Sequence, residues 1–326
     1  MKKLPWLLLA GAGLALAQTG GLLPPGGRAY PRPSWIQPGL LVAYTDGVGQ
    51  TAAAYLVTRV AGGRAYGLAL TLFQSEAGPT LQVQAEPLYD GGSGPFVVHP
   101  AAVRDFLQNP PPGVQAMGVP GQLGVVIQDP DGVTKHAVRY DPQSGLVTEV
   151  TSSYRAPAGV GPRRSVAVHL VLAGRRRVAW RVVEAFPPAA RAAARYQVLY
   201  ALAGGTAPGG TVTVTPAGGT PPLARYRVEA AGAGELQPPS VQYGLPVMGP
   251  HYLHPALLAR TPLLQVPELG LVFQVAGRDP SGAVWVAATA GGRTFERLAV
   301  DPQSGAVLEQ EIAYPGMGTA IYRRLP

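Results

Sequence analysis

The segment Asp141–Glu149 reads Asp-Pro-Gln-Ser-Gly-Leu-Val-Thr-Glu, and Asp301–Glu309 repeats it as Asp-Pro-Gln-Ser-Gly-Ala-Val-Leu-Glu. The match extends to Tyr154 and Tyr314, with eight identities in 14 positions. In such a segment proline fixes φ at the second turn position, aspartate accepts from backbone N–H groups and glycine adopts positive φ. Because alternating apolar and polar residues flank both copies, each copy predicts a hairpin turn between two antiparallel strands.

Two further pairs of segments recur in the same order along the chain. Gly94–Ala101 matches Gly249–Ala256 around a shared His-Pro-Ala, and Pro120–Gln128 resembles Pro267–Gln274. Three recurring blocks predict an internal duplication. The Pro- and Gly-rich stretch Pro157–Pro162 is the expected seam.

The regular alternation of short apolar runs and turns predicts a mainly β fold made of two sequence-related antiparallel β units, each with a short helix. Short runs rich in Val, Leu, Tyr and Thr alternate with Gly- and Asp-containing turns, a pattern typical of sandwiches, barrels or curved sheets. The expected organisation is a signal peptide, a Pro/Gly-rich leader and two β repeat units, at Met1–Ala17, Gln18–Pro38, Gly39–Ala158 and Gly159–Pro326.

Helix signals are few. Pro100–Leu107 and Pro255–Leu264 each open with proline, which suits the first turn of a helix. The alanine-rich segment Pro188–Tyr196 could form a third helix or continue as a strand.

The first residues predict export. Lys2 and Lys3 precede an uncharged apolar stretch, and Ala15-Leu16-Ala17 forms the small-x-small pattern that a signal peptidase cuts. Cleavage after Ala17 would leave Gln18 first and place the protein in a periplasm or outside the cell. The chain contains no cysteine, which excludes a lipoprotein anchor, disulfides and thiolate metal sites.

Composition adds weaker indications. The formal net charge is +8, which favours anionic partners. The basic residues are scattered and accompany no nucleic-acid-binding motif, so the sequence disfavours nucleic acid. Asn109 is the only asparagine and prolines are frequent, as is typical of thermophilic proteins and of GC-rich genomes.

Three histidines are the candidate functional residues. His99 and His254 each precede a proline that could start a helix, so they can cap that helix or dock on the sheet. Alternatively, His251 and His254 could hold a zinc or copper ion together with His99. Because no carboxylate adjoins them, we expect one of these two structural roles, capping or docking, with no metal, cofactor or catalytic residue.

Glu309 and Glu311 alternate on one predicted strand and therefore share a face, and Glu149 is the first-copy counterpart of Glu309. Paired carboxylates can hydrolyse glycosides. On an exposed strand face such a pair is more often solvated, and this is the interpretation we favour.

The strand-turn-strand ending in Asp-Pro-x-Ser-Gly-Leu resembles envelope proteins of the LolA-like class. This resemblance implies a curved half-barrel sheet that holds a lipid or a lipoprotein acyl chain, and it assigns no residue a role. The sequence favours an exported, non-catalytic cell-envelope protein that binds a lipid, a glycan or another envelope protein through a curved β-sheet surface. The alternatives are a secreted hydrolase or metal-dependent enzyme using the His99, His251 and His254 region, and a structural or surface-layer interaction protein.

Overall fold

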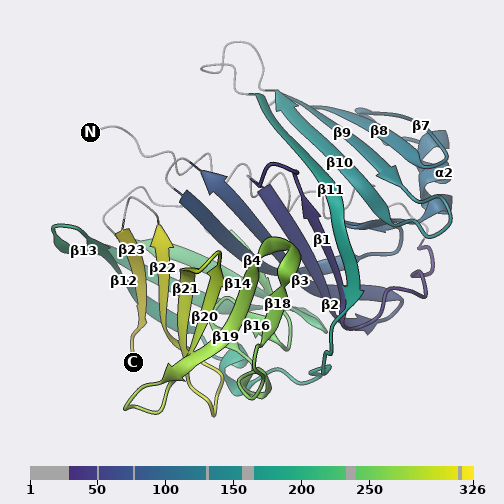
Figure 1. Ribbon diagram of the computed structural model, residues 1–326. Coiled ribbons are helices and arrows are strands. Elements are labelled where there is room, and N and C mark those ends of the chain that lie inside the picture. The colour runs from purple at the N-terminus through teal and green to yellow at the C-terminus, as the bar shows by residue number, and fades with distance from the viewer. Residues whose placement is uncertain are drawn as a thin grey trace. The chain divides into compact units, whose positions relative to one another are not determined.

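Two large antiparallel sheets dominate the computed structural model (Figure 1). The structure describes residues 29–49, 51–75, 78–129, 132–155, 165–232, 240–314 and 318–326. The expected signal peptide and the expected seam at Pro157–Pro162 lie outside these ranges. The mainly β fold predicted from the sequence is confirmed.

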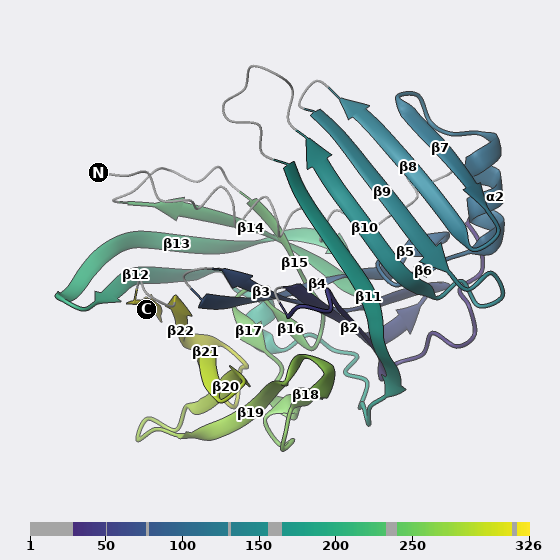
Figure 2. The same ribbon diagram turned by 45° about the horizontal axis from the view of Figure 1, so that its top comes forward.

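The first sheet has nine strands, with β1 and β11 adjacent near its middle. In spatial order they are β4 (Gly78–Tyr89), β3 (Arg64–Ser75), β2 (Thr51–Ala61), β1 (Leu40–Thr45), β11 (Ser165–Arg177), β10 (Val147–Arg155), β9 (Gly132–Tyr140), β8 (Gln122–Asp129) and β7 (Val114–Val119). Strands β8 to β11 run side by side in Figure 2. The hairpin β5 (Ser93–Gly94) and β6 (Val97–Val98) precedes helix α2 (Pro100–Gln108), which packs against β7.

The second sheet has ten strands. In spatial order they are β15 (Ser240–Gly244), β14 (Leu223–Ala231), β13 (Gly205–Thr220), β12 (Ala194–Leu202), β23 (Gly318–Arg324), β22 (Val307–Tyr314), β21 (Arg293–Val300), β20 (Val284–Ala290), β19 (Leu271–Arg278) and β18 (Leu264–Val266). The short elements are the hairpin β16 (Met248–Gly249) and β17 (Tyr252–Leu253), and the 3-10 helices η2 (Pro188–Arg191), η3 (Pro255–Leu257) and η4 (Pro267–Leu269).

Packing divides the described chain into two compact units, within Met1–Ala65 and Pro87–Ala179 and within Tyr66–Glu86 and Trp180–Pro326. The sequence placed the boundary between Ala158 and Gly159. Strand β11 follows that position and pairs with both β1 and β10, so the first unit extends to Ala179.

The two sheets share a strand order. Outward from β11 the first sheet continues β10-β9-β8-β7, and outward from β23 the second continues β22-β21-β20-β19. The recurring blocks around His-Pro-Ala and Asp-Pro-Gln-Ser-Gly occupy equivalent places. The third pair does not, because β8 lies three strands from β11 whereas β19 lies four strands from β23. The duplication itself stays a prediction.

Both Asp-Pro-Gln-Ser-Gly segments form the predicted turns. The Asp141 carboxylate accepts from the Gln143 N–H at 2.9 Å, and Asp301 accepts from the Gln303 N–H at 3.0 Å. The hydroxyls of Ser144 and Ser304 also donate to these carboxylates, and they are the main reason, before the glutamine N–H bonds, that the pKa of Asp141 and of Asp301 lies below its usual range. The turns join β9 to β10 and β21 to β22.

A tyrosine from the middle of each sheet fixes the strand that follows the turn. The hydroxyl of Tyr44 on β1 donates to the Val147 carbonyl at 2.8 Å. The hydroxyl of Tyr196 on β12 donates to the Val307 carbonyl at 2.9 Å. Both rings are buried, so these bonds act in a medium where an unmade hydrogen bond is costly.

The helix predictions have mixed outcomes. Helix α2 confirms the helix expected at Pro100–Leu107, and it buries Ala102, Val103 and Phe106. The helix expected at Pro255–Leu264 is wrong beyond the single turn η3, and Pro262 excludes a helix that continues to Leu264. Segment Pro188–Tyr196 splits into η2 and the start of β12.

Candidate functional site

His99 and His254 cap the segments that follow them. The Nδ1 atom of His99 accepts from the Ala101 N–H at 3.2 Å, and Nδ1 of His254 accepts from the Ala256 N–H at 3.1 Å. Both residues have extended backbone, as expected immediately before proline. Desolvation lowers the pKa of each imidazole, and Arg104 lowers that of His99 further. Of the two structural roles that the sequence allowed, capping is therefore the one observed in both units.

His251 is fully buried and engages backbone carbonyls. Its Nε2 lies 2.9 Å from the Ala189 carbonyl and 3.1 Å from the Ala192 carbonyl, so Nε2 carries the proton and donates. Its Nδ1 is buried and has no hydrogen-bond partner within the described part of the chain. Burial is the main reason that the pKa of His251 is lowered.

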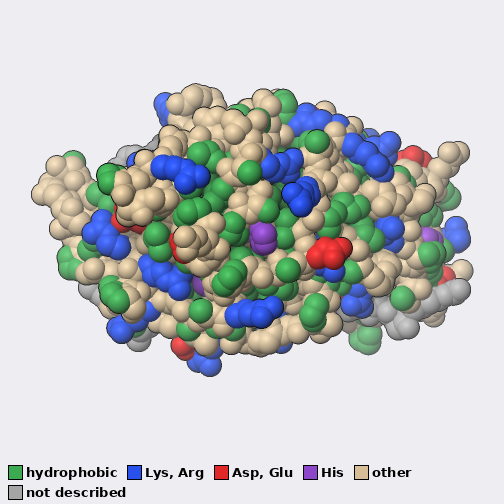
Figure 3. All heavy atoms as spheres, turned by 90° about the horizontal axis from the view of Figure 1, so that it is seen from below, with side chains coloured by type: hydrophobic (Ala, Val, Ile, Leu, Met, Phe, Trp, Pro, Cys, Tyr) green, Lys and Arg blue, Asp and Glu red, His purple; other side chains and the backbone are tan. Residues whose placement is uncertain are grey.

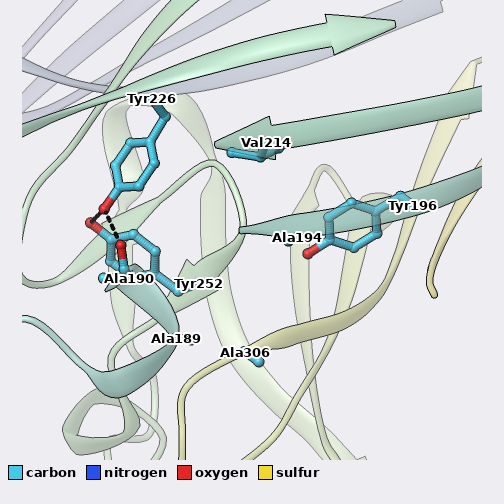
Figure 4. Close-up of a cluster of buried hydrophobic side chains, with 8 residues drawn as sticks. All are labelled: Ala189, Ala190, Ala194, Tyr196, Val214, Tyr226, Tyr252 and Ala306. Atoms are coloured by element: carbon cyan, nitrogen blue, oxygen red, sulfur yellow. Dashed lines mark hydrogen bonds between the residues drawn. The ribbon is translucent and has the colours of Figure 1, made fainter. Parts of the chain in front are cut away.

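Tyrosine rings surround His251 in the core of the second unit. The rings of Tyr226 and Tyr252 meet it edge-on, with centroids 5.0 and 5.3 Å away. Figure 4 shows the Tyr226 hydroxyl between Tyr252 and the Ala190 carbonyl, to which it donates at 2.9 Å. Among the described residues no three His, Asp or Glu side chains are grouped so that they could hold a metal ion. The structure thus places the three candidate histidines at backbone contacts.

The candidate glutamates form ion pairs on one face of the second sheet, which we call the ion-pair face. Glu309 lies 2.8 Å from Arg323, and Glu311 lies 3.0 Å from Arg297. The Arg297 guanidinium in turn lies 4.4 Å from the centre of the Trp285 ring.

Glu149 in the first unit contacts two basic side chains. It bonds Arg139 at 3.1 Å and His169 at 3.0 Å. These partly exposed contacts favour the solvated interpretation of all three glutamates over glycoside chemistry. Figure 3 likewise shows Lys and Arg side chains dispersed over the face in view.

The opposite face of the second sheet carries a group of polar and aromatic side chains. Directly paired residues of neighbouring strands point to the same face. Tyr322 pairs with Gln310, which pairs with Leu298, and Ile312 pairs with Glu296. Strand alternation adds the remaining members, on β12 and β22. We call this group the tyrosine face, and it consists of Tyr200, Glu296, Gln310, Tyr314 and Tyr322.

Glu296 is the ionisable centre of the tyrosine face. Its Oε1 accepts a hydrogen bond from the side-chain amide of Gln310. Burial raises the pKa of Glu296, and the Gln310 bond offsets only part of that rise. A carboxyl group that loses its hydration without gaining a cation is held at a cost in stability.

The three phenols lie within electrostatic reach of one another. Desolvation raises the pKa of Tyr314, and Tyr322, Tyr200 and Glu296 raise it further. Desolvation and Tyr200 likewise raise the pKa of Tyr322. All five side chains of the tyrosine face are half-buried, and Tyr322 also packs on the core cluster that contains Tyr196 and Tyr252. The tyrosine face is thus partly desolvated and partly accessible, and Tyr322 joins it to the hydrophobic core of the second unit.

The first sheet carries a histidine at the position equivalent to Glu296. His136 pairs with Ser152 across β9 and β10, as Glu296 pairs with Ile312 across β21 and β22. His136 Nδ1 lies 2.8 Å from the Ser152 hydroxyl, and desolvation lowers the pKa of His136. Their neighbours on this face, Val125, Val150 and Val168, are aliphatic.

Sequence reasoning missed both His136 and Glu296. A Ser–His contact is one component of nucleophilic catalysis, which also needs a group that orients the base. Among the described residues no carboxylate bonds the other ring nitrogen of His136. The His136–Ser152 pair therefore fits a polar contact within an apolar surface better than a catalytic pair.

Comparisons with known proteins give no family. No family model matches the chain, and no curated protein matches it. A solved structure that resembles it is that of a protein of unknown function from the DUF3598 family of Nostoc punctiforme, at 8% sequence identity and a TM-score of 0.17. That similarity covers 88% of this chain and 95% of the other.

Proposed function

We propose that this protein is an exported, non-catalytic cell-envelope protein that binds a ligand on the tyrosine face of its second sheet. The observation that supports this most directly is the contrast between the two faces of one sheet. On the ion-pair face Glu309 and Glu311 each form an ion pair with an arginine, as is usual for a solvated surface. On the tyrosine face Glu296 is desolvated and has no such partner among the described residues.

Half-buried aromatic side chains that surround a few polar groups are the usual composition of a small-molecule site. Tyrosine suits this purpose because its ring offers a large apolar surface and its hydroxyl can hydrogen-bond. The packing of Tyr322 on the core favours a preformed surface, which lowers the cost of ordering on binding.

The export part of the proposal depends on Lys2, Lys3 and the Ala15–Ala17 pattern alone. None of the described helices combines the length and apolarity needed to cross a bilayer. The hydrolase alternative has less support, because the ring nitrogens of His99 and His254 cap backbone N–H groups and His251 donates to carbonyls. The surface-layer alternative has no specific observation in its favour.

The test is native mass spectrometry of the protein purified from its own envelope, with solvent extraction of any bound species. We expect a co-purifying small molecule that the Tyr200→Ala/Tyr314→Ala double variant loses. Tyr243→Ala is the matched control, because Tyr243 is an exposed tyrosine on the edge strand β15. A wild-type mass equal to that of the bare chain, with no binding from an envelope extract, would contradict the proposal.

A further inference from the structure

The glutamates of the second sheet differ in how their charge is balanced. On strands β14, β21 and β22 there are four described glutamates, and three of them have an arginine partner: Glu229 with Arg227 at 2.6 Å, Glu309 with Arg323 and Glu311 with Arg297. Glu296 is the fourth, and in the described chain its side chain bonds only the neutral amide of Gln310. Among the described residues of this sheet, Glu296 is therefore the carboxyl group without a counter-charge, and it lies on the tyrosine face.

The surroundings of Glu296 favour a positive charge. Tyr200, Tyr314 and Tyr322 come from three different strands. They lie close enough that Tyr200, Tyr322 and Glu296 all raise the pKa of Tyr314, and Tyr200 raises that of Tyr322. A cation near the face of a phenol ring gains about 0.5 to 2 kcal/mol, depending on how far it is desolvated. A carboxylate and several phenols together are the chemistry that recognises organic ammonium groups.

A metal ion fits this group less well than an organic cation does. Calcium requires six to eight oxygen ligands, whereas the tyrosine face offers one carboxyl group and the amide oxygen of Gln310. The phenols remain protonated, since burial raises the pKa of Tyr314 and Tyr322, and neutral phenols are weak metal ligands.

We propose that the ligand of the tyrosine face is an organic cation, an amine or a quaternary ammonium, whose positive charge lies beside the Glu296 carboxylate and against the rings of Tyr314 and Tyr322. This inference rests on the proposed function and names its ligand class. The first sheet serves as an internal contrast, because His136 holds the position equivalent to Glu296 and would not attract a cation.

The test compares choline with 3,3-dimethylbutan-1-ol, its uncharged isostere, by calorimetry or by tyrosine fluorescence of the wild-type protein. We expect choline to bind about tenfold more tightly than the alcohol. Glu296→Gln should remove that difference, because the variant keeps the shape of the side chain and loses its charge. Glu309→Gln is the matched control on the ion-pair face and should bind choline as the wild type does.

A second measurement needs no variant. Choline affinity of the wild type should increase as the pH rises, because deprotonation of Glu296 supplies the charge that attracts the ligand. Affinity that is unchanged from about pH 5 to about pH 8, or equal binding of choline and the alcohol, would overturn the cation inference while leaving ligand binding intact. Failure of both probes, together with a wild-type protein that carries no co-purified molecule, would overturn the proposed function as well.

Discussion

His251 occupies in the second unit the place that Phe96 occupies in the first. The carbonyl of each accepts a hydrogen bond from the valine that begins the strand after the turn, Val307 or Val147, at 3.0 Å in both cases. The side chains differ in polarity, since Phe96 buries a hydrocarbon ring and His251 buries an imidazole with an unpartnered Nδ1.

His251→Phe should make the second unit less sensitive to acid. Burial lowers the pKa of His251 below its unfolded value of about 6.5, so the unfolded chain binds the proton more readily. The wild type should therefore lose stability as the pH falls below about 6.5. At about pH 7.5 the free energy of unfolding of the variant should be about 1 to 3 kcal/mol lower than that of the wild type, because the Ala189 and Ala192 carbonyls lose their donor. Melting temperatures measured across this range check the prediction, and parallel curves for the two proteins would contradict it.

Gly145→Ala and Gly305→Ala should destabilise the protein to similar extents. These glycines have φ of 74° and 77°, and a Cβ would overlap the carbonyl oxygen of Val98 or of Leu253. We expect a loss of about 3 to 4 kcal/mol for each by denaturant unfolding. Gly62→Ala and Gly291→Ala are the controls, because these positions have positive φ but no neighbouring atom that a Cβ would meet. They measure the backbone strain alone and should cost only about 1 to 2 kcal/mol. If only one of Gly145→Ala and Gly305→Ala caused a large loss of stability, the two turns would not be structurally equivalent.

His254→Ala should cost about 1 kcal/mol, as for a lost cap. His99→Ala should cost more, because His99 also stacks on Tyr30 with ring centroids 5.1 Å apart. Added zinc should leave the wild-type melting temperature unchanged. A zinc-dependent rise that disappears in His251→Ala and His254→Ala would instead establish a metal site.

Glu296→Gln should stabilise the ligand-free protein at neutral pH. Because burial raises the pKa of Glu296, the folded state loses stability as the pH rises above the unfolded value of about 4.3. The gain in melting temperature should therefore be largest above neutral pH and should vanish in acid. Glu311→Gln, which removes a partly exposed ion pair, provides the comparison and should change stability by about 1 kcal/mol or less.

N-terminal sequencing of the mature protein should begin at Gln18, since the peptidase motif ends at Ala17. An intact Met1 in the membrane fraction would contradict export with cleavage.

Local chemistry decided which features could be predicted from the sequence. The Asp-Pro-Gln-Ser-Gly turns and the histidine caps depend on neighbouring residues, so the turns were predicted and the caps were one of the two structural roles expected. The partners of His136 and Glu296 depend on strand register, which alternation alone does not give. One signal was present, because these two residues are separated by the same 160 positions as Asp141 and Asp301. The third recurring block is not in an equivalent place, since two strands, β20 and β21, separate it from the Asp-Pro-Gln-Ser-Gly turn in the second unit whereas only β9 does so in the first.

Strand β23 is the last strand in the described chain and lies in the middle of the second sheet, between β12 and β22. Until it is synthesised, the strands on its two sides have no ladder to join them, and Tyr322 is absent. The second sheet is therefore completed late, through pairings between residues far apart in sequence, which makes its folding slow. Proteolytic trimming within Gly318–Arg324 would separate the sheet into two halves, whereas an equal loss at the edge strand β18 would remove only three residues of pairing.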